Sequence, residues 1–198
     1  MTASKDDQNS QIPLSLAQFS NLLQAAAKLF QRGDLAQADA LCEQILVNHP
    51  SHFDAIYYRG MIARKLGDLQ VAEGYFLRAL TIRNDFAPIH SSYALVLHDL
   101  RRFGDALFHY ERSIALDPGF GVAYYNAGIS LERLGRLDSA LAFYNYAITL
   151  EPHHCDFWNN RGNTLKTLNR VEESLDSYAG AIVLKPDYSA AYNNRGVS

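Results

Sequence analysis

Residues 121–154 read GVAYYNAGISLERLGRLDSALAFYNYAITLEPHH, and residues 155–188 read CDFWNNRGNTLKTLNRVEESLDSYAGAIVLKPDY. Each stretch is 34 residues long, and residues of the same kind recur at the same places in both. Pro118, Pro152 and Pro186 repeat this interval along the chain. A fixed period of this length predicts a stacked array of small supersecondary units rather than one globular core.

Counting each unit so that its proline stands at position 32 divides most of the chain into repeats. Five complete repeats and the start of a sixth follow, at 19–52, 53–86, 87–120, 121–154, 155–188 and 189–198. Positions 4, 8 and 11 are mostly apolar or small, as are positions 20, 24 and 27, and each set shares one helical face. Small residues at positions 8 and 20 allow two helices to pack closely. The pattern therefore predicts a pair of packed helices in each repeat.

The turn between the two helices is marked by position 15. It is glycine or asparagine in four repeats, and both residue types tolerate the left-handed conformation that ends a helix. Arg101 stands at this position in the third repeat. We therefore expect the turn of the third repeat to be capped differently.

The series of aromatic, glycine, leucine, alanine, aromatic, alanine and proline residues resembles the tetratricopeptide repeat family over residues 19–198. The resemblance implies an all-α fold, an α-solenoid of antiparallel helix pairs with five full repeats and the first helix of a sixth. We expect residues 15–198 to form this solenoid and the polar residues 1–14 to be disordered. Solenoids normally end in a polar cap, so we expect either that the chain is part of a longer protein or that its last helix is a short cap.

Composition excludes several classes of function. The chain has 18 Lys and Arg against 21 Asp and Glu, which argues against a nucleic-acid or anionic-membrane surface. No run approaches the roughly 18 apolar residues of a membrane span, and no apolar signal segment is visible. Cys42 falls at a core position and Cys155 at a helix start, so neither indicates a disulfide. We expect a reduced, cytoplasmic protein.

Asparagines are concentrated at positions 5, 6 and 9 of the later repeats. In the tetratricopeptide family this side of the first helix lines the concave surface, so the resemblance places ligand contacts there. The asparagines are Asn126, Asn159, Asn160, Asn163, Asn193 and Asn194. A carboxamide both donates and accepts hydrogen bonds, so the row predicts contacts with the main chain of an extended peptide. The alternative is soluble filler, which explains a row of fixed spacing less well.

The earlier repeats carry aromatic and apolar residues on the same surface. They are Tyr57, Tyr58, Met61, Leu95, Tyr125 and Ile129. Such a patch predicts an interaction site, and tyrosine and methionine suit adaptable contacts. The alternative is that an N-terminal segment or a second copy of the chain packs into it.

These surfaces predict a non-catalytic scaffold that binds an extended peptide or a partner protein. The row Asn126, Asn160 and Asn194 also resembles the repeat arrays of bacterial relatives of the O-linked N-acetylglucosamine transferases, in which concave asparagines hold the peptide substrate. That resemblance implies an alternative, a substrate-recruiting part of a protein glycosyltransferase whose catalytic domain lies beyond residue 198. A third alternative is self-assembly through the uncapped last helix.

Motifs for catalysis and metal binding are absent from the sequence. No phosphate loop, dinucleotide fingerprint or nucleophile elbow occurs, so we expect no enzymatic activity in these residues and no cofactor. His153, His154 and Cys155 are adjacent at a turn and cannot readily converge on one ion, so we expect no metal site. His90, at position 4, is interpreted as a hydrogen-bonded packing residue.

Position 7 carries an arginine in three repeats, as Arg59, Arg161 and Arg195. Arginine stems can cover apolar surface while the guanidinium reaches water. We interpret these side chains as covering the seam between helices. The sequence does not indicate what their guanidinium groups contact.

Overall fold

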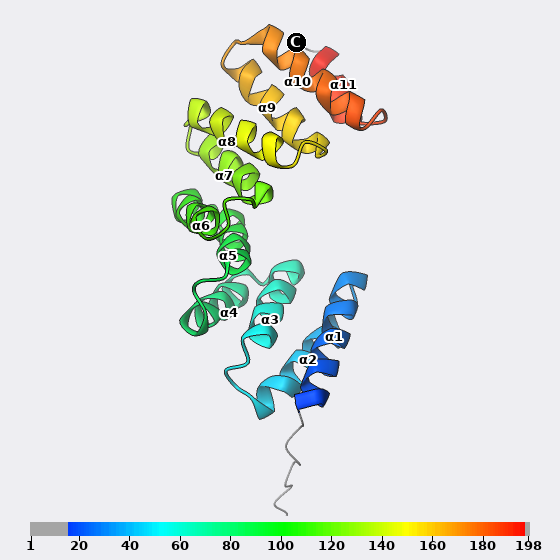
Figure 1. Ribbon diagram of the computed structural model, residues 1–198, viewed down its shortest axis with the longest axis vertical. Helices are drawn as coiled ribbons and strands as arrows, with labels where there is room; N and C mark the ends of the chain where they lie inside the picture. The colour runs from blue at the N-terminus through cyan, green and yellow to red at the C-terminus, as the bar shows by residue number, and fades with distance from the viewer. Residues whose placement is uncertain (1–15, 197–198) are drawn as a thin grey trace, which may run out of the picture.

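The computed structural model describes residues 16–196, which form eleven α-helices and no strand (Figure 1). The helices are α1 (Leu16–Arg32), α2 (Leu35–Asn48), α3 (Phe53–Leu66), α4 (Leu69–Ile82), α5 (Ala87–Asp99), α6 (Phe103–Leu116), α7 (Gly121–Arg133), α8 (Leu137–Leu150), α9 (Cys155–Thr167), α10 (Val171–Leu184) and α11 (Ser189–Gly196). Odd-numbered helices are the first helices of the repeats and even-numbered helices are the second. The predicted all-α solenoid of five helix pairs and a sixth first helix is confirmed. The expectation of disorder in residues 1–14 lies outside the described residues.

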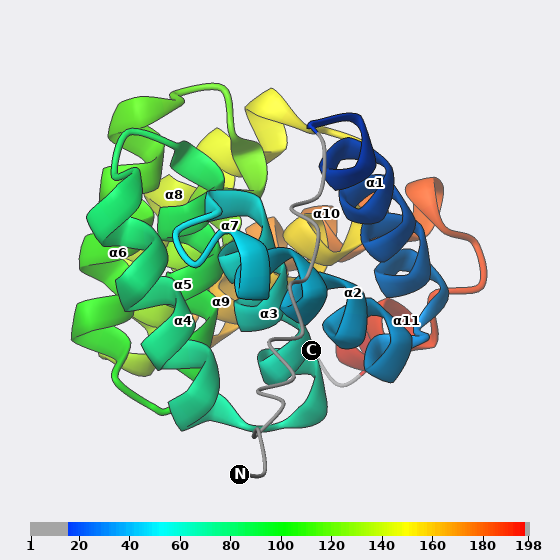
Figure 2. The same cartoon turned by 90° about the horizontal axis from the view of Figure 1, so that it is seen from below.

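The helix pairs stack along one direction. Each of α3, α5, α7 and α9 contacts the second helix of its own repeat and that of the preceding repeat, while α1 contacts α2 and α11 contacts α10. Figure 1 shows the stack rising from α1 and α2 to α10 and α11. Seen along the stack in Figure 2, the pairs wind around a common axis. This is the quasi-one-dimensional architecture in which each repeat packs only against its neighbours.

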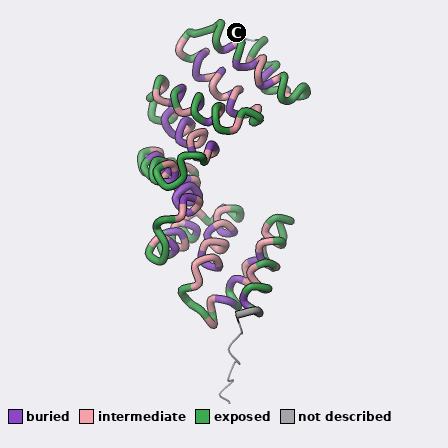
Figure 3. Tube along the Cα trace, in the orientation of Figure 1, coloured by how far each residue is buried: buried purple, intermediate pink, exposed green. Residues whose placement is uncertain are grey.

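The core runs as a seam between the helices of the array, seen as the purple stretches of Figure 3. Every residue at positions 20, 24 and 27 of the five complete repeats is at most 1% exposed. Burying one large side chain of this set, such as Phe76, stabilises the fold by about 1.5–3 kcal/mol. The predicted packing faces of the second helices are therefore confirmed.

In the fourth and fifth repeats, glycine at position 8 lets the two helices pack closely. A Cβ added to Gly162 would lie 2.5 Å from the ring of Tyr178, and one added to Gly128 would lie 2.6 Å from the ring of Tyr144. Each ring stands at position 24 of the repeat to which its glycine belongs. The absence of a side chain on the first helix thus makes room for an aromatic ring on the second.

The five turns between paired helices share one backbone conformation. Gly33, Gly67 and Gly135 have φ values of 88°, 88° and 74°, and Arg101 and Asn169 have φ values of 62° and 59°. The expectation of a different cap at Arg101 is wrong. The Arg102 amide donates to the Leu97 carbonyl over 2.8 Å, as equivalent amides do in the other repeats. Helix packing fixes this turn, so arginine adopts a left-handed conformation that costs about 1–2 kcal/mol.

A proline follows the end of four of the five second helices. Pro50, Pro118, Pro152 and Pro186 each lie two residues after the last residue of a second helix. Proline lacks the amide hydrogen that would continue the helix.

In the described part of the chain, no helix has the length and apolar character needed to cross a membrane.

Candidate functional site

The predicted ligand contacts lie on the first helices. We call the surface formed by positions 5, 6 and 9 of α1, α3, α5, α7, α9 and α11 the first-helix face. Tyr57, Tyr58 and Met61 lie on α3, Leu95 on α5, and Asn126 with Tyr125 and Ile129 on α7. The remaining asparagines lie on α9 and α11, as Asn159, Asn160, Asn163, Asn193 and Asn194.

Hydrogen bonds join successive first helices across this face at a regular spacing. The Tyr57 hydroxyl and the Ser92 hydroxyl are 2.9 Å apart. Asn160 Nδ2 donates to the Tyr125 hydroxyl over 2.9 Å. Asn194 Nδ2 donates to Asn159 Oδ1 over 3.0 Å. Each bond joins position 5 of one repeat to position 6 of the next, 35 residues later.

Four of the six asparagines form one network. Besides the bonds above, Asn159 Nδ2 lies 3.4 Å from Asn160 Oδ1, and Asn194 Nδ2 donates to Asn163 Oδ1 over 3.0 Å. Asn159 is only 5% exposed. Because their amide groups already bond to one another, these four asparagines help to hold the repeats together.

Asn126 and Asn193 differ from this network. Asn126 is half-buried and Asn193 is exposed. Within residues 16–196, neither carboxamide has a hydrogen-bond partner in the protein. Asn126 therefore keeps both its donor and its acceptor capacity for a ligand.

The aromatic residues of the first-helix face are half-buried. The ring of Tyr57 lies 6.2 Å from that of Phe53 and 6.4 Å from that of Phe86, between centroids. The ring of Tyr58 lies 5.9 Å from that of Phe30. Burial raises the pKa of Tyr57, so its hydroxyl is neutral at physiological pH. Both rings therefore pack in part against the protein and remain partly exposed.

The other apolar residues of the first-helix face are also partly buried. Met61, Leu95 and Ile129 are half-buried and pack against the main core. Tyr125 stacks on Phe157 with ring centroids 4.4 Å apart, and burial raises its pKa to about 12. Its neutral hydroxyl is thus the acceptor for Asn160 across the physiological range.

Glu132 is a residue that the sequence interpretation missed. Its carboxylate accepts hydrogen bonds from the Tyr144 hydroxyl, over 2.9 Å, and from the Thr164 hydroxyl. Glu132 lies on α7, Tyr144 on α8 and Thr164 on α9, so these contacts link two repeats. No cation within residues 16–196 forms an ion pair with Glu132. The sequence does carry a signal for Glu132: it is a carboxylate at position 12, where the other complete repeats have an aromatic or a basic residue.

Arg59 forms an ion pair rather than only covering a seam. Its Nε and Nη2 donate to the two carboxylate oxygens of Asp39, over 2.8 Å and 2.9 Å. The guanidinium also lies 5.1 Å from the centroid of the Tyr75 ring. These residues line a pocket of about 210 Å³ with other residues of α3 and α4. Arg195 is exposed on α11.

Exposed apolar side chains gather on the second helices, which the sequence interpretation did not consider. Phe108 on α6 is 57% exposed, Tyr146 on α8 is 60% exposed, and Val183 on α10 is 80% exposed. Their signal in the sequence is an apolar residue away from positions 20, 24 and 27. We call the surface formed by α2, α4, α6, α8 and α10 the second-helix side.

The histidines and cysteines have structural surroundings. His90 is buried, with its Nδ1 3.0 Å from Nδ1 of His109 and its Nε2 3.0 Å from the Asn84 carbonyl oxygen. His154 Nε2 lies 2.9 Å from Glu151 Oε2. No group of three or more potential metal ligands occurs in the described residues. Cys42, which is buried, and Cys155, which is half-buried, are both free thiols.

Comparison with known proteins gives one family. Two family sequence profiles match, both described as tetratricopeptide repeat, one at residues 17–88 and 94–154 and the other at residues 156–188. A comparison with curated proteins finds no match.

Solved structures of the same architecture resemble the whole array. YrrB, described as a tetratricopeptide protein with an unusual peptide-binding site, is 24% identical over 88% of this chain and 90% of its own, with a TM-score of 0.73. MamA from Desulfovibrio magneticus RS-1 is 18% identical over 86% of this chain and 96% of its own, with a TM-score of 0.77. Pseudomonas aeruginosa pilF is 15% identical over 89% of this chain and 88% of its own, with a TM-score of 0.77. At these identities the likeness establishes the fold alone.

Proposed function

The chain belongs to the tetratricopeptide repeat family, and on that premise we propose that it is a non-catalytic scaffold that binds an extended peptide or a partner protein along its first-helix face. The peptide-binding site described for YrrB supports a ligand of this class. The observation that carries the proposal is Asn126. It lies in the middle of the face with a carboxamide that has no protein partner within residues 16–196.

The surroundings of Asn126 suit a peptide. Tyr125 and Ile129 lie on the same helix and are half-buried, so each offers apolar surface beside the carboxamide. The carboxamide matches both the amide and the carbonyl of a main chain. Successive helices pack about 10 Å apart, and three extended residues cover about that distance. One repeat therefore meets about three residues of a bound strand.

The network of Asn159, Asn160, Asn163 and Asn194 acts as a rigid support in this proposal. A surface whose side chains are already held by hydrogen bonds loses little freedom when a ligand binds. Asn160 Nδ2 donates one hydrogen to Tyr125, and an amide nitrogen carries two. Asn160 thus retains a donor for a peptide carbonyl.

The test is to select binders from a displayed library of random twelve-residue peptides and to measure one binder by calorimetry. We expect Asn126→Ala to weaken binding about fivefold to tenfold, since one hydrogen bond contributes about 1 kcal/mol. Met61→Ala should also weaken binding of a peptide that extends to α3. Asn21→Ala, an exposed asparagine on α1, is the matched control and should bind as the parent does.

A second measurement identifies the face. Phe108→Ala removes an exposed ring from the second-helix side and should leave the affinity unchanged. If no peptide is selected, or if the selected peptides respond to Phe108→Ala and not to Asn126→Ala, the proposal is wrong.

Self-association is a second candidate, favoured by Tyr192 on α11. Tyr192 stands at position 4, where its equivalents Ile56 and His90 are buried, yet it is 49% exposed. We expect Tyr192→Lys to lower any dimer fraction seen by sedimentation velocity. A sedimentation coefficient that stays constant over a hundredfold concentration range of the parent chain would exclude this candidate.

A further inference from the structure

At two repeat boundaries, position 7 of a first helix meets position 21 of the preceding second helix. In the second repeat, Arg59 meets Asp39 in a bidentate ion pair. In the third repeat, the Tyr93 hydroxyl donates to Glu73 Oε1 over 2.9 Å. At both boundaries the donor at position 7 therefore finds a carboxylate in the same place.

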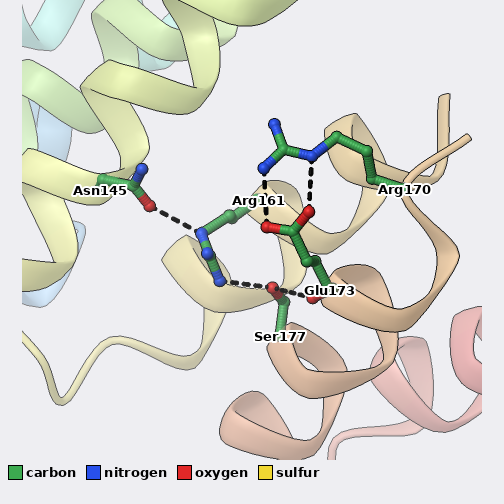
Figure 4. Close-up of polar contacts among 5 residues, drawn as sticks. All are labelled: Asn145, Arg161, Arg170, Glu173 and Ser177. Carbon is green, nitrogen blue, oxygen red and sulfur yellow. Dashed lines mark hydrogen bonds and ion pairs between the residues drawn. The ribbon is translucent and has the colours of Figure 1, made fainter. Parts of the chain in front are cut away.

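Arg161 is the equivalent of Arg59 in the fifth repeat, and it has no such carboxylate. Position 21 of the preceding repeat is Leu141, which is 5% exposed. Arg161 instead donates from Nε to Asn145 Oδ1 and from Nη1 to the Ser177 hydroxyl, each over 2.7 Å (Figure 4). Both acceptors are neutral groups.

Two carboxylates, Glu173 and Asp176, act electrostatically on Arg161, and the one with the larger effect, Glu173, is already engaged. Both oxygens of Glu173 accept hydrogen bonds from Arg170, each over 2.7 Å. Figure 4 shows the Glu173 carboxylate turned toward Arg170, while the Arg161 guanidinium lies between Asn145 and Ser177. In the described part of the chain, no carboxylate forms an ion pair with Arg161.

The charge on Arg161 is therefore incompletely compensated. Arginine remains protonated in proteins and offers five N–H donors. Two of the five meet protein acceptors, which leaves three without a partner within residues 16–196. Arg161 is half-buried, so burial disfavours its charge and lowers its pKa. A cation in such a setting gains more from a carboxylate partner than an exposed one does.

The site opens on the second-helix side. Asn145 lies on α8 and is exposed, and Ser177 lies on α10. The guanidinium of Arg161 points toward these two second helices, between Asn145 and Ser177 (Figure 4). Because Asn145 is exposed, the Nε side of the guanidinium lies beside a residue that reaches solvent.

We propose that Arg161 is a docking point for an aspartate or glutamate side chain of a protein partner on the second-helix side. A carboxylate is the chosen chemistry because Asp39 and Glu73 accept hydrogen bonds from position 7 at the earlier boundaries, whereas Leu141 offers no acceptor to Arg161. The planar guanidinium fork also matches a carboxylate in two-point contact. This docking point is separate from the peptide surface proposed above, so either proposal stands without the other.

The experiment follows the Nε–Hε resonances of the arginines by NMR in the full chain. The probe is acetyl-hexaglutamate amide, and the control probe is acetyl-hexaglutamine amide. We expect the Arg161 resonance to shift and saturate with the glutamate peptide only. The Arg59 resonance should stay still, since Asp39 already occupies that guanidinium.

Two substitutions test the site further, one by giving Arg161 a carboxylate partner and the other by removing the partner of Arg59. Asn145→Asp places a carboxylate, nearly isosteric with the amide, on Arg161, so we expect the affinity of Arg161 for the glutamate peptide to fall at least about tenfold. Asp39→Asn removes the partner of Arg59, so the Arg59 resonance should now respond to the peptide. Asn145 is exposed, and a far-ultraviolet circular dichroism spectrum checks that the fold is kept.

Three results would overturn the proposal. The first is an Arg161 resonance that the glutamate peptide does not move. The second is an Asn145→Asp chain that binds the peptide as tightly as the parent. The third is a response to inorganic phosphate at concentrations where the glutamate peptide has no effect, which would make the site a phosphate site.

Discussion

Asn160 donates a hydrogen bond from Nδ2 to the Tyr125 hydroxyl over 2.9 Å, and this bond joins α9 to α7 of the preceding repeat. Tyr57 and Ser92 join α3 to α5 in the same register. Solenoid stability is the sum of the repeats and of the interfaces between neighbours. Side chains on the first-helix face therefore couple neighbouring repeats.

The coupling can be measured with Tyr125→Phe. This change removes the hydroxyl and leaves the Asn160 amide without its acceptor. We expect the free energy of unfolding in urea to fall by about 1 kcal/mol. A double-mutant cycle with Asn160→Ala should give a coupling energy of about 0.5–1.5 kcal/mol.

The matched control is Tyr124→Phe on the same helix. Tyr124 is also half-buried, and its hydroxyl has no hydrogen-bond partner within residues 16–196. Its loss should change the stability by less than about 0.5 kcal/mol. Equal effects at the two tyrosines, or a coupling energy near zero, would show that the Tyr125–Asn160 bond does not stabilise the array.

The glycine at position 8 gives a second prediction. Gly162→Ala places a methyl group against the ring of Tyr178, which is fully buried. Overpacking of this kind costs about 1–3 kcal/mol, so we expect the midpoint of urea unfolding to fall.

Gly74→Ala is the control for helix propensity. Gly74 lies inside α4, and a Cβ there meets nothing within 4 Å. Alanine is favoured over glycine in a helix by up to about 1 kcal/mol, so this variant should be as stable as the parent or more so. A stabilised Gly162→Ala chain would show that the Tyr178 ring moves aside freely.

The His90–His109 pair gives a pH dependence. His90 Nε2 faces the Asn84 carbonyl and so carries a hydrogen, which makes its Nδ1 the acceptor from His109 Nδ1. Burial, followed by the neighbouring His90, lowers the pKa of His109 from 6.5 to about 4. Arg102 and Arg112 also lower it, and Asp105 opposes them.

The sign follows from proton binding. Between its unfolded pKa of 6.5 and its folded pKa of about 4, His109 binds more protons in the unfolded chain. Stability is therefore full above about pH 6.5 and falls as the pH drops toward about 4. We expect the Tm at about pH 5 to lie below that at about pH 7, with a smaller difference in His109→Gln. His153→Gln, which changes an exposed histidine, should keep the parent's pH dependence, and an unchanged pH dependence in His109→Gln would contradict this account.

The sequence predicts the core well because packing positions repeat every 34 residues. Ala38, Cys42 and Ile45 and their equivalents are all buried, as the helical spacing predicts. Hydrogen bonds such as that between Asn160 and Tyr125 are harder to predict, since they join position 5 of one repeat to position 6 of the next. Their geometry depends on the angle between neighbouring repeats, which no single repeat contains.

Arg59 and Arg161 show the same limit. The same residue at the same position is ion-paired in one repeat and meets only neutral groups in another. The difference comes from position 21 of the preceding repeat, which is Asp39 for Arg59 and Leu141 for Arg161. Knowing that positions 7 and 21 meet across a boundary would have revealed it from the sequence.

The turn at Arg101 gives the last prediction. Its φ of 62° matches the φ of 74° at Gly135 in the next repeat, although Arg101 carries a Cβ. Relief of the left-handed conformation is worth about 1–2 kcal/mol, and glycine loses about 0.5–1 kcal/mol of this through its greater freedom in the unfolded chain. We expect Arg101→Gly to raise the free energy of unfolding by about 0.5–1 kcal/mol. The mirror change, Gly135→Arg, should lower it by a similar amount, since nothing lies within 4 Å of a Cβ there and only the backbone is strained. Urea titrations of both variants check the pair, and a loss of stability in Arg101→Gly would mean that the arginine side chain stabilises its turn.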